Sequence, residues 1–271
     1  MQAEGNVMQT DPSEVVTREL QGAACIITLN EPDRLNPMSD AMRAALLAAL
    51  EAAMADQDVR AVILTGAGGN FTAGADIRQL SSSSTPDPAR YRRRLVPLHR
   101  MIELVAGGPK PVITAIEGAA FGLGLSIAAA SDFVVAGDSA RFGAAFGKIG
   151  LTADCGLAWS LPQRVDRTYA RDIMYTGRPV KAEEAHRIGI VDRLVPAGQA
   201  LSAALEKVDD YLGVAPLAIA AMKFAFAQGP GPLAETLALE MQQQPMLSMT
   251  LDHAEGIAAF REKRLPRFTG N

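Results

Sequence analysis

Cysteine and histidine are scarce in this chain of 271 residues. The two cysteines, Cys25 and Cys155, lie far apart in apolar stretches, and the three histidines, His99, His186 and His253, are scattered. Such a pattern offers neither the cysteine pairs of a disulfide framework nor the clustered spacing of metal ligands. We therefore expect two buried thiols and no metal site.

Excess basic charge and long apolar runs are also lacking. The chain has 26 Lys and Arg against 30 Asp and Glu, a formal net charge of −4. A nucleic-acid surface needs a basic stripe, so we expect no nucleic-acid partner. No stretch approaches the roughly 20 uncharged apolar residues of a membrane helix. The N-terminal "MQAEGNVMQTDPSE" has no apolar core of a secretory signal, so we expect a cytoplasmic protein without a membrane partner.

Hydrophobic residues, in contrast, make up 48% of the chain, which allows a substantial core. In the segment Ser39–Asp56, apolar residues follow helical spacing behind Ser39, which is suited to cap a helix N-terminus. Such helical stretches alternate with Val- and Ile-rich runs, and this alternation predicts an α/β core built from crossover units. The predicted strands are Ala23–Leu29, Ala61–Thr65, Pro111–Ile116, Phe133–Ala136 and Val191–Val195. Most of them are continuous apolar runs, which is typical of strands buried on both faces.

Composition changes along the chain suggest three parts. The low-complexity stretch "SSSSTPDPAR" at Ser81–Arg90 predicts a mobile surface loop. Three arginines that follow it are expected on the solvated face of a helix: Arg92, Arg93 and Arg94. Beyond Val195 the pattern is helical, with breaks at "GVAP" and "QGPGP". We expect a disordered N-terminal tail at residues 1–14, a folded core at residues 15–196 and a helical C-terminal region at residues 197–271.

Two glycine-rich turns follow predicted strands: "GGNFTAGADIRQL" at Gly68–Leu80 and "EGAAFGLGLSIAAA" at Glu117–Ala130. Glycine lets backbone N–H groups approach a ligand closely, and N–H groups at a helix start favour negative charge. The second turn does not complete a dinucleotide fingerprint, because Ile127 stands where the third glycine would be. The stretch "GAAFGK" has neither the spacing nor the Ser or Thr of a phosphate-binding P-loop. We therefore expect no nucleotide cofactor.

Together these turns resemble the crotonase superfamily, the enoyl-CoA hydratases and isomerases. Five stretches match in order from about Leu20 onward: "LNEPDRLNPMS", "FTAGADI", "KPVITAIEGAAFGLGLSIAAASDFVVAGDSARFG", "TGRPVKAEEAHRIGIVDRLVP" and "EGIAAFREKRLPRF". The resemblance implies an α/β fold, a crotonase-type spiral of repeated ββα units with a C-terminal helical trimerisation region. It also implies a homotrimer or a dimer of trimers.

The resemblance implies an acyl-CoA substrate and no separate cofactor, since CoA is part of the substrate. When such a thioester loses an α-proton, negative charge builds on its carbonyl oxygen, and two fixed N–H donors stabilise it. At the family's positions these donors are the backbone N–H groups of Ala75 and Leu123. The other positions implied to contact substrate or CoA are Arg34, Ala73, Gly74, Asp76, Ile77, Gly122, Phe146, Phe260 and Lys263, the last two often across a subunit boundary.

The sequence departs from the hydratases at the two glutamates that activate water in that branch. By motif, the first falls on Ser126 and the second on Phe146. Neither side chain can carry out acid–base chemistry. Hydration is therefore the second choice for this chain.

Asp154, in "GLTADCGLAW", lies where isomerase branches of the family carry one acid/base carboxylate. A double-bond shift needs one base that removes a proton and returns it elsewhere, so we predict an enoyl-CoA isomerase of the double-bond-shift or ring-epoxide type. A structural alternative for Asp154 is that its side chain caps the following helix. Two other functions remain for the whole chain: an aryl-CoA dehalogenase that uses His99, and an acyl-CoA-binding protein without catalytic activity. Glu117 and Asp76 flank the turns and are expected to hold loops through backbone hydrogen bonds.

Overall fold

The computed structural model describes residues 14–76, 87–229 and 231–271, except for the side chain of Arg90. Its main sheet has six strands in the order β1-β2-β3-β4-β6-β9, in which β1 pairs antiparallel with β2 and the other neighbours are parallel. The strands are β1 (Val16–Gln21), β2 (Ala24–Leu29), β3 (Ala61–Gly66), β4 (Val112–Ile116), β6 (Phe133–Gly137) and β9 (Arg193–Val195). The five strand predictions are confirmed, with small shifts at their ends.

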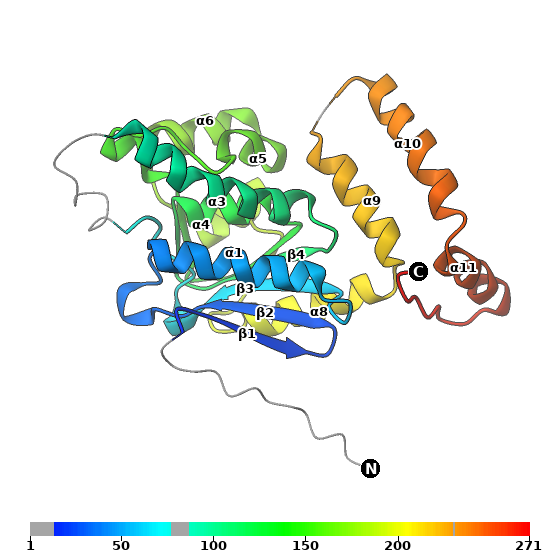
Figure 1. The fold of residues 1–271 in the computed structure, drawn as a ribbon. Coiled ribbons are helices and arrows are strands. Elements are labelled where there is room, and N and C mark those ends of the chain that lie inside the picture. The colour runs from blue at the N-terminus through cyan, green and yellow to red at the C-terminus, as the bar shows by residue number, and fades with distance from the viewer. Residues whose placement is uncertain (1–13, 77–86, 230) are drawn as a thin grey trace, which may run out of the picture.

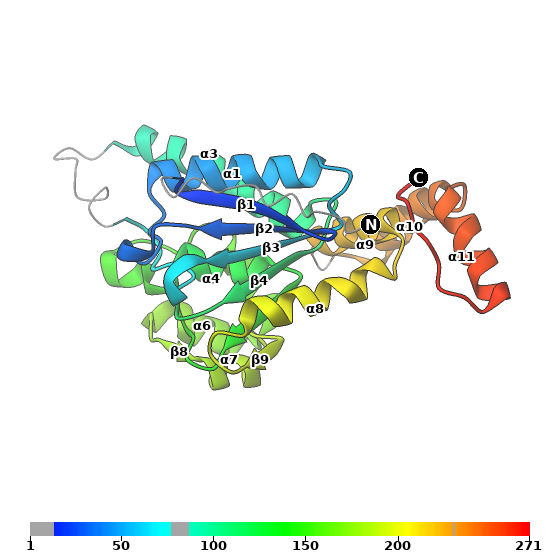
Figure 2. The same ribbon diagram turned by 90° about the horizontal axis from the view of Figure 1, so that it is seen from below.

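Both faces of this sheet are buried, as the continuous apolar runs predict. On one face, Cys25 and Ile27 of β2 join a core cluster with α1 (Asp40–Ala55) and α3 (Pro88–Gly107). On the other face, Ile26 packs in a second cluster with α8 (Ala200–Leu212). Figure 2 shows α1 and α3 on one side of the sheet and α8 on the other. Both cysteines are free and buried, as expected.

A smaller sheet follows the end of β4 and carries part of the site. It contains β5 (Ala119–Phe121), β7 (Arg141–Gly143) and β8 (Val180–Lys181), with β7 in the middle. Four further helices surround it or follow it along the chain: α4 (Leu123–Ala130), α5 (Leu157–Arg164), α6 (Arg167–Thr176) and α7 (Ala182–Ile188). The successive strand–strand–helix units therefore wind from one sheet to the next, and the fold is the expected mixed α/β spiral.

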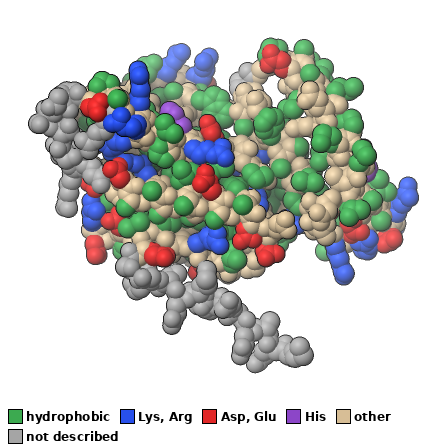
Figure 3. Space-filling view, viewed as in Figure 1, with side chains coloured by type: hydrophobic (Ala, Val, Ile, Leu, Met, Phe, Trp, Pro, Cys, Tyr) green, Lys and Arg blue, Asp and Glu red, His purple; other side chains and the backbone are tan. Residues whose placement is uncertain are grey.

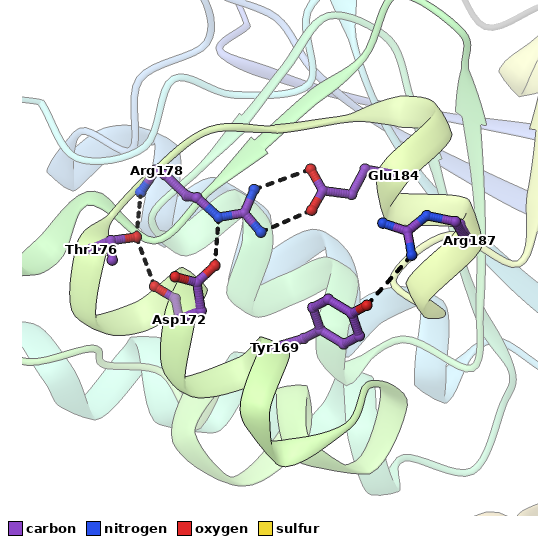
Figure 4. Close-up of polar contacts among 6 residues, drawn as sticks. All are labelled: Tyr169, Asp172, Thr176, Arg178, Glu184 and Arg187. Carbon is purple, nitrogen blue, oxygen red and sulfur yellow. Dashed lines mark hydrogen bonds and ion pairs between the residues drawn. The ribbon is translucent and has the colours of Figure 1, made fainter.

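An ion-pair cluster joins α6 to α7 (Figure 4). Arg178 donates from Nε to Asp172 at 2.5 Å and from its two terminal nitrogens to both oxygens of Glu184, at 3.0 and 2.8 Å. The hydroxyl of Thr176 donates to the Asp172 carbonyl at 2.7 Å. A bidentate guanidinium–carboxylate pair has a fixed geometry, so it holds α7 at a set angle to α6.

The helix α1 begins as the sequence predicts, because the Ser39 hydroxyl oxygen accepts the N–H of Met42 at 3.1 Å. The C-terminal part is helical, as predicted, and comprises α8 followed by α9 (Pro216–Ala227), α10 (Leu233–Leu247) and α11 (Leu251–Glu262). These last three helices extend from the end of the sheet layers and form an arm (Figure 1).

Among the described residues, no helix is by itself long and apolar enough to cross a membrane. Only α8 and α9 taken together reach that length, and they are bent by 109°.

Candidate active site

The two glycine-rich turns lie against each other, although Leu123 comes 48 positions after Ala75 in the sequence. The N–H of Thr72 donates to the Ala119 carbonyl at 2.8 Å, and the N–H of Phe121 donates to the Thr72 carbonyl at 3.1 Å. This bridge between the first turn and β5 brings the two sequence motifs into one place.

Gly74 makes this close approach possible. Its φ is +92°, and a Cβ atom at this position would lie 2.7 Å from the carbonyl oxygen of Phe121. A non-glycine residue would therefore be strained by its backbone conformation and would also collide with the second turn. The segment before α1 fixes the same turn, because the N–H of Met38 donates to the Gly74 carbonyl at 2.8 Å.

Ala75 and Leu123 are placed as a pair of available donors. Both line one cavity of about 200 Å³. Within the part of the chain that the structure describes, neither backbone N–H donates a hydrogen bond to another protein atom. Leu123 is the first residue of α4, where an N–H group has no partner inside the helix and the helix dipole is positive. The cavity thus offers two backbone donors to an oxygen that carries negative charge.

Asp154 lines the same cavity, between η3 (Ala145–Ile149) and α5. Burial raises the pKa of its carboxyl group, and this effect is opposed by a hydrogen bond from the Cys155 thiol and by the nearby charges of His99 and Arg43. The capping interpretation is wrong, because Gly156 is the N-cap of α5 and no side chain caps this helix. The carboxyl group is therefore a half-buried acid or base beside the two donors.

The two positions that carry glutamate in hydratases are also at this site. The hydroxyl of Ser126 donates to the backbone carbonyls of Gly122 and Asp154, at 3.3 and 3.2 Å. Phe146 lines the cavity. Among the described residues that line the cavity, Asp154 is the one carboxylate.

The remaining predicted contact positions divide into two groups. Ala73, Gly74 and Gly122 line the cavity, whereas Arg34 and Asp76 form an ion pair of 2.6 Å beside the first turn. Phe260 and Lys263 lie at the end of the C-terminal arm and do not reach the cavity within one chain. Ile77 and the predicted loop up to Pro86 lie outside the described residues.

Glu117 holds the second turn, as expected. Its Oε1 accepts the N–H groups of Gly198 and Ala200, at 2.9 and 3.0 Å. These bonds join the end of β4 to the start of α8. His99 is exposed on α3 and does not line the cavity, although its charge lies close enough to Asp154 to lower the pKa of that carboxyl.

Two cavity residues differ from the sequence-based expectations. Arg94 was expected with Arg92 and Arg93 on a solvated face, but its side chain is only 17% exposed and lines the cavity. Arg43, which is not among the sequence-predicted site residues, is buried and also lines the cavity. A signal was present, because Arg43 precedes Leu47 by four residues and so lies on the apolar side of α1.

Comparisons of sequence give a consistent result. The family model described as enoyl-CoA hydratase/isomerase matches residues 19–271. A 1,2-epoxyphenylacetyl-CoA isomerase of Escherichia coli (strain K12) is 33% identical over 262 residues, which cover 95% of this chain and 99% of the relative. The enoyl-CoA hydratase EchA19 of Mycobacterium tuberculosis is 34% identical over 264 residues, with coverages of 96% and 98%.

Solved structures agree with these relatives. The crystal structure of an enoyl-CoA hydratase from Polaromonas sp. JS666 superimposes with a TM-score of 0.87 at 34% identity, covering 93% of this chain and 99% of that one. An enoyl-CoA hydratase from Bacillus anthracis gives 0.88 at 30% identity, with coverages of 95% and 100%. The likeness therefore extends over nearly the whole chain.

Proposed function

The chain belongs to the enoyl-CoA hydratase/isomerase family, within the crotonase superfamily, and we propose that it is an isomerase of acyl-CoA thioesters. The reaction is a double-bond shift or a ring-epoxide isomerisation that passes through an enolate. One observation carries the proposal: a single described carboxylate, Asp154, lines the same cavity as the two available N–H donors. This set of groups is sufficient for proton transfer, without a metal or redox cofactor.

The two backbone donors act on the thioester carbonyl. Its oxygen gains negative charge when a proton leaves the adjacent carbon, and the N–H groups of Ala75 and Leu123 can donate to it. One such donor contributes about 3 kcal/mol to stabilising the charged state. The N-terminal end of α4 adds a positive dipole at Leu123.

Asp154 moves the proton. As a carboxylate it removes a proton from one carbon of the acyl group, and as the neutral acid it returns the proton to another carbon. Both forms must be accessible during turnover, and burial brings the pKa of the carboxyl closer to the working pH than that of an exposed aspartate.

Hydration is the second candidate, and the names of several relatives favour it. Water must then be activated by Asp154 alone, because Ser126 and Phe146 offer no carboxyl group. General acid–base groups each contribute roughly 10²–10⁴-fold to a rate. We therefore expect crotonyl-CoA to be hydrated more slowly than trans-3-hexenoyl-CoA is isomerised.

Proton exchange tests the role of Asp154. The wild-type protein and Asp154→Asn are incubated with trans-3-hexenoyl-CoA in deuterated water, and mass spectrometry follows deuterium entry and the 2-enoyl product. We expect at least a roughly 10²-fold loss of both rates in the variant, with retained binding of hexanoyl-CoA by calorimetry. Asp209→Asn, a change at an exposed aspartate of α8, is the matched control. Exchange at the wild-type rate in folded Asp154→Asn would refute the assignment.

We also propose that the arm of α9, α10 and α11 packs against other copies of the chain in a homotrimer or a dimer of trimers. Large apolar side chains of this region lie at the surface (Figure 3). Phe226, Phe260 and Leu265 are 80%, 87% and 88% exposed. Exposed apolar patches of this kind are typical of protein interfaces. In such an assembly Phe260 and Lys263 can approach the CoA bound to a neighbouring chain.

A further inference from the structure

The cavity is mostly apolar but contains two guanidinium groups. Arg43 lies in the first turn of α1 and is 5% exposed, and Arg94 lies on the neighbouring helix α3. The two helices pack side by side over the sheet (Figure 1). The other described walls of the cavity are largely hydrophobic and include Tyr91, Leu95, Leu98, Phe146 and Leu151.

Arg43 is held rigidly at this position. One terminal nitrogen donates to the Met38 carbonyl at 2.7 Å, and the other forms an ion pair with Asp40. Burial lowers the pKa of Arg43, and the neighbouring positive charge of Arg94 lowers it further. The guanidinium is therefore fixed by the protein, and its ion pair with Asp40 partly offsets the loss of water.

Arg94 also lies near the carboxylate of Asp40. Its Nε lies 3.9 Å from Asp40, and its guanidinium carbon lies 6.0 Å from the ring centre of Tyr91. The charged groups among the described lining residues are thus two arginines and Asp154, whose burial favours the neutral acid. Within the lining, two positive charges therefore stand against one carboxyl group, while Asp40, whose side chain is 66% exposed, lies beside both arginines.

This charge is unfavourable for a plain hydrocarbon chain. Placing an acyl chain against two arginines removes more of their water without replacing its hydrogen bonds. A carboxylate in the same place accepts charge-assisted hydrogen bonds from the guanidinium groups, and arginine is well suited to bind it in a bidentate manner.

Resting on the proposed function, we infer that the acyl group of the substrate carries a second carboxylate at the end remote from the thioester, held by Arg43 and Arg94. The substrate class is then the mono-CoA thioester of an unsaturated dicarboxylic acid. The thioester end contacts Ala75, Leu123 and Asp154, and the arginines select the remote end.

Binding of unreactive saturated analogues tests this inference. Calorimetry compares glutaryl-CoA with pentanoyl-CoA and adipoyl-CoA with hexanoyl-CoA, so that the CoA part and the carbon number are the same within each pair. We expect at least one carboxylated ligand to bind about tenfold more tightly than its uncharged partner. If uncharged thioesters bind and both carboxylated ones bind equally or less tightly, the inference fails and the proposed function stands. If none of the four binds to the folded protein, the proposed function fails as well.

Two variants test the assignment to the arginines. In Arg94→Gln we expect the preference for the carboxylated ligand, expressed as a ratio of dissociation constants, to fall at least about fivefold. Arg92→Gln removes the same charge from an exposed position on α3 and should leave this ratio unchanged. Arg43→Gln should lower the ratio further, and thermal melting shows whether this buried variant is folded. An unchanged ratio in folded Arg94→Gln overturns the assignment, whatever the outcome for Arg43→Gln.

Discussion

The protonation state of Asp154 affects the stability of the folded protein, and the dependence of stability on pH reports it. Its folded-state pKa is raised by burial, so the folded protein holds this proton more tightly than the unfolded chain does. Protonation of Asp154 contributes its full stabilisation at pH values below about 3.9, the pKa of the carboxyl group in the unfolded chain. This stabilisation is lost as the pH rises through the higher pKa that the group has in the folded protein.

Asp154→Asn should therefore be more stable than the wild type at neutral pH, because an amide has no proton to lose. We expect the melting temperature of the variant to exceed that of the wild type at pH 7–8, with a difference that shrinks toward pH 4. Differential scanning calorimetry across this range measures the effect, and Asp209→Asn serves as the exposed control. A variant that melts below the wild type at pH 7–8 would contradict the direction of the pKa shift.

Gly74 allows a second test at the scale of one residue. Gly74→Ala places a methyl group 2.7 Å from the Phe121 carbonyl oxygen at a φ of +92°, so the two turns must separate. Because this moves the Ala75 donor away from the substrate oxygen, we expect kcat/KM to fall roughly 10²-fold. Gly69→Ala is the matched control, since φ there is +72° but no atom lies within 4 Å of the added Cβ. Equal losses in the two variants would indicate backbone strain alone.

The sequence indicates some of these residues and not others, for physical reasons. The motifs predict Ala75, Leu123 and Asp154, and the structure brings all three to one cavity. Whether an N–H group lacks a partner depends on tertiary pairing, which no local pattern encodes. Arg94 follows two arginines that are exposed, and only the packing of α3 against α1 separates it from them.

At the scale of elements, an ion pair between the buried Lys223 and the partly exposed Asp132 fastens α9 to the core. The ammonium group of Lys223 donates to the Lys110 carbonyl at 2.9 Å and forms an ion pair with Asp132, which in turn accepts the N–H of Val112 at 2.7 Å. Burial lowers the pKa of Lys223 and raises that of Asp132, while their mutual attraction opposes both shifts. The pair joins the arm to the first residue of β4.

Lys223→Met should loosen this attachment. The change removes the hydrogen bonds to the Lys110 carbonyl and to Asp132, whose side chain is 28% exposed, so we expect a loss of about 1–3 kcal/mol in the free energy of unfolding. Urea denaturation measures it, with Lys181→Met, a change at an exposed lysine of β8, as the control. A loss no larger than that of the control would show that α9 is held by its apolar contacts instead.

The elements differ in how clearly the sequence predicts them. The strands β2, β3, β4 and β6 are continuous apolar runs because helices cover both faces of the sheet. The edge strand β1 reads "VTRELQ" and has largely exposed side chains toward its end, so its apolar pattern is weak. The strands β5, β7 and β8 have two or three residues each, too few for any period to appear.

At the scale of the molecule, the arm predicts association. We expect light scattering to give a mass of about three times 28.6 kDa, or twice that value for a dimer of trimers. Phe226→Asp places a charge on the exposed apolar surface of the arm and should reduce the mass. Tyr175→Asp, at a 79% exposed position of α6, is the control. A monomer at micromolar concentration would contradict the trimer proposal while leaving the binding experiments unaffected.

The contact between Glu117 and the start of α8 has a consequence for the timing of biosynthesis. Gly198, one of its two backbone donors, is 81 residues further along the chain. At the usual elongation rate of about 5–20 residues per second, the ribosome needs roughly 4–16 s to add them. During that interval the turn that carries Leu123 lacks this contact, and all six strands of the main sheet have been synthesised by the time that Gly198 is added.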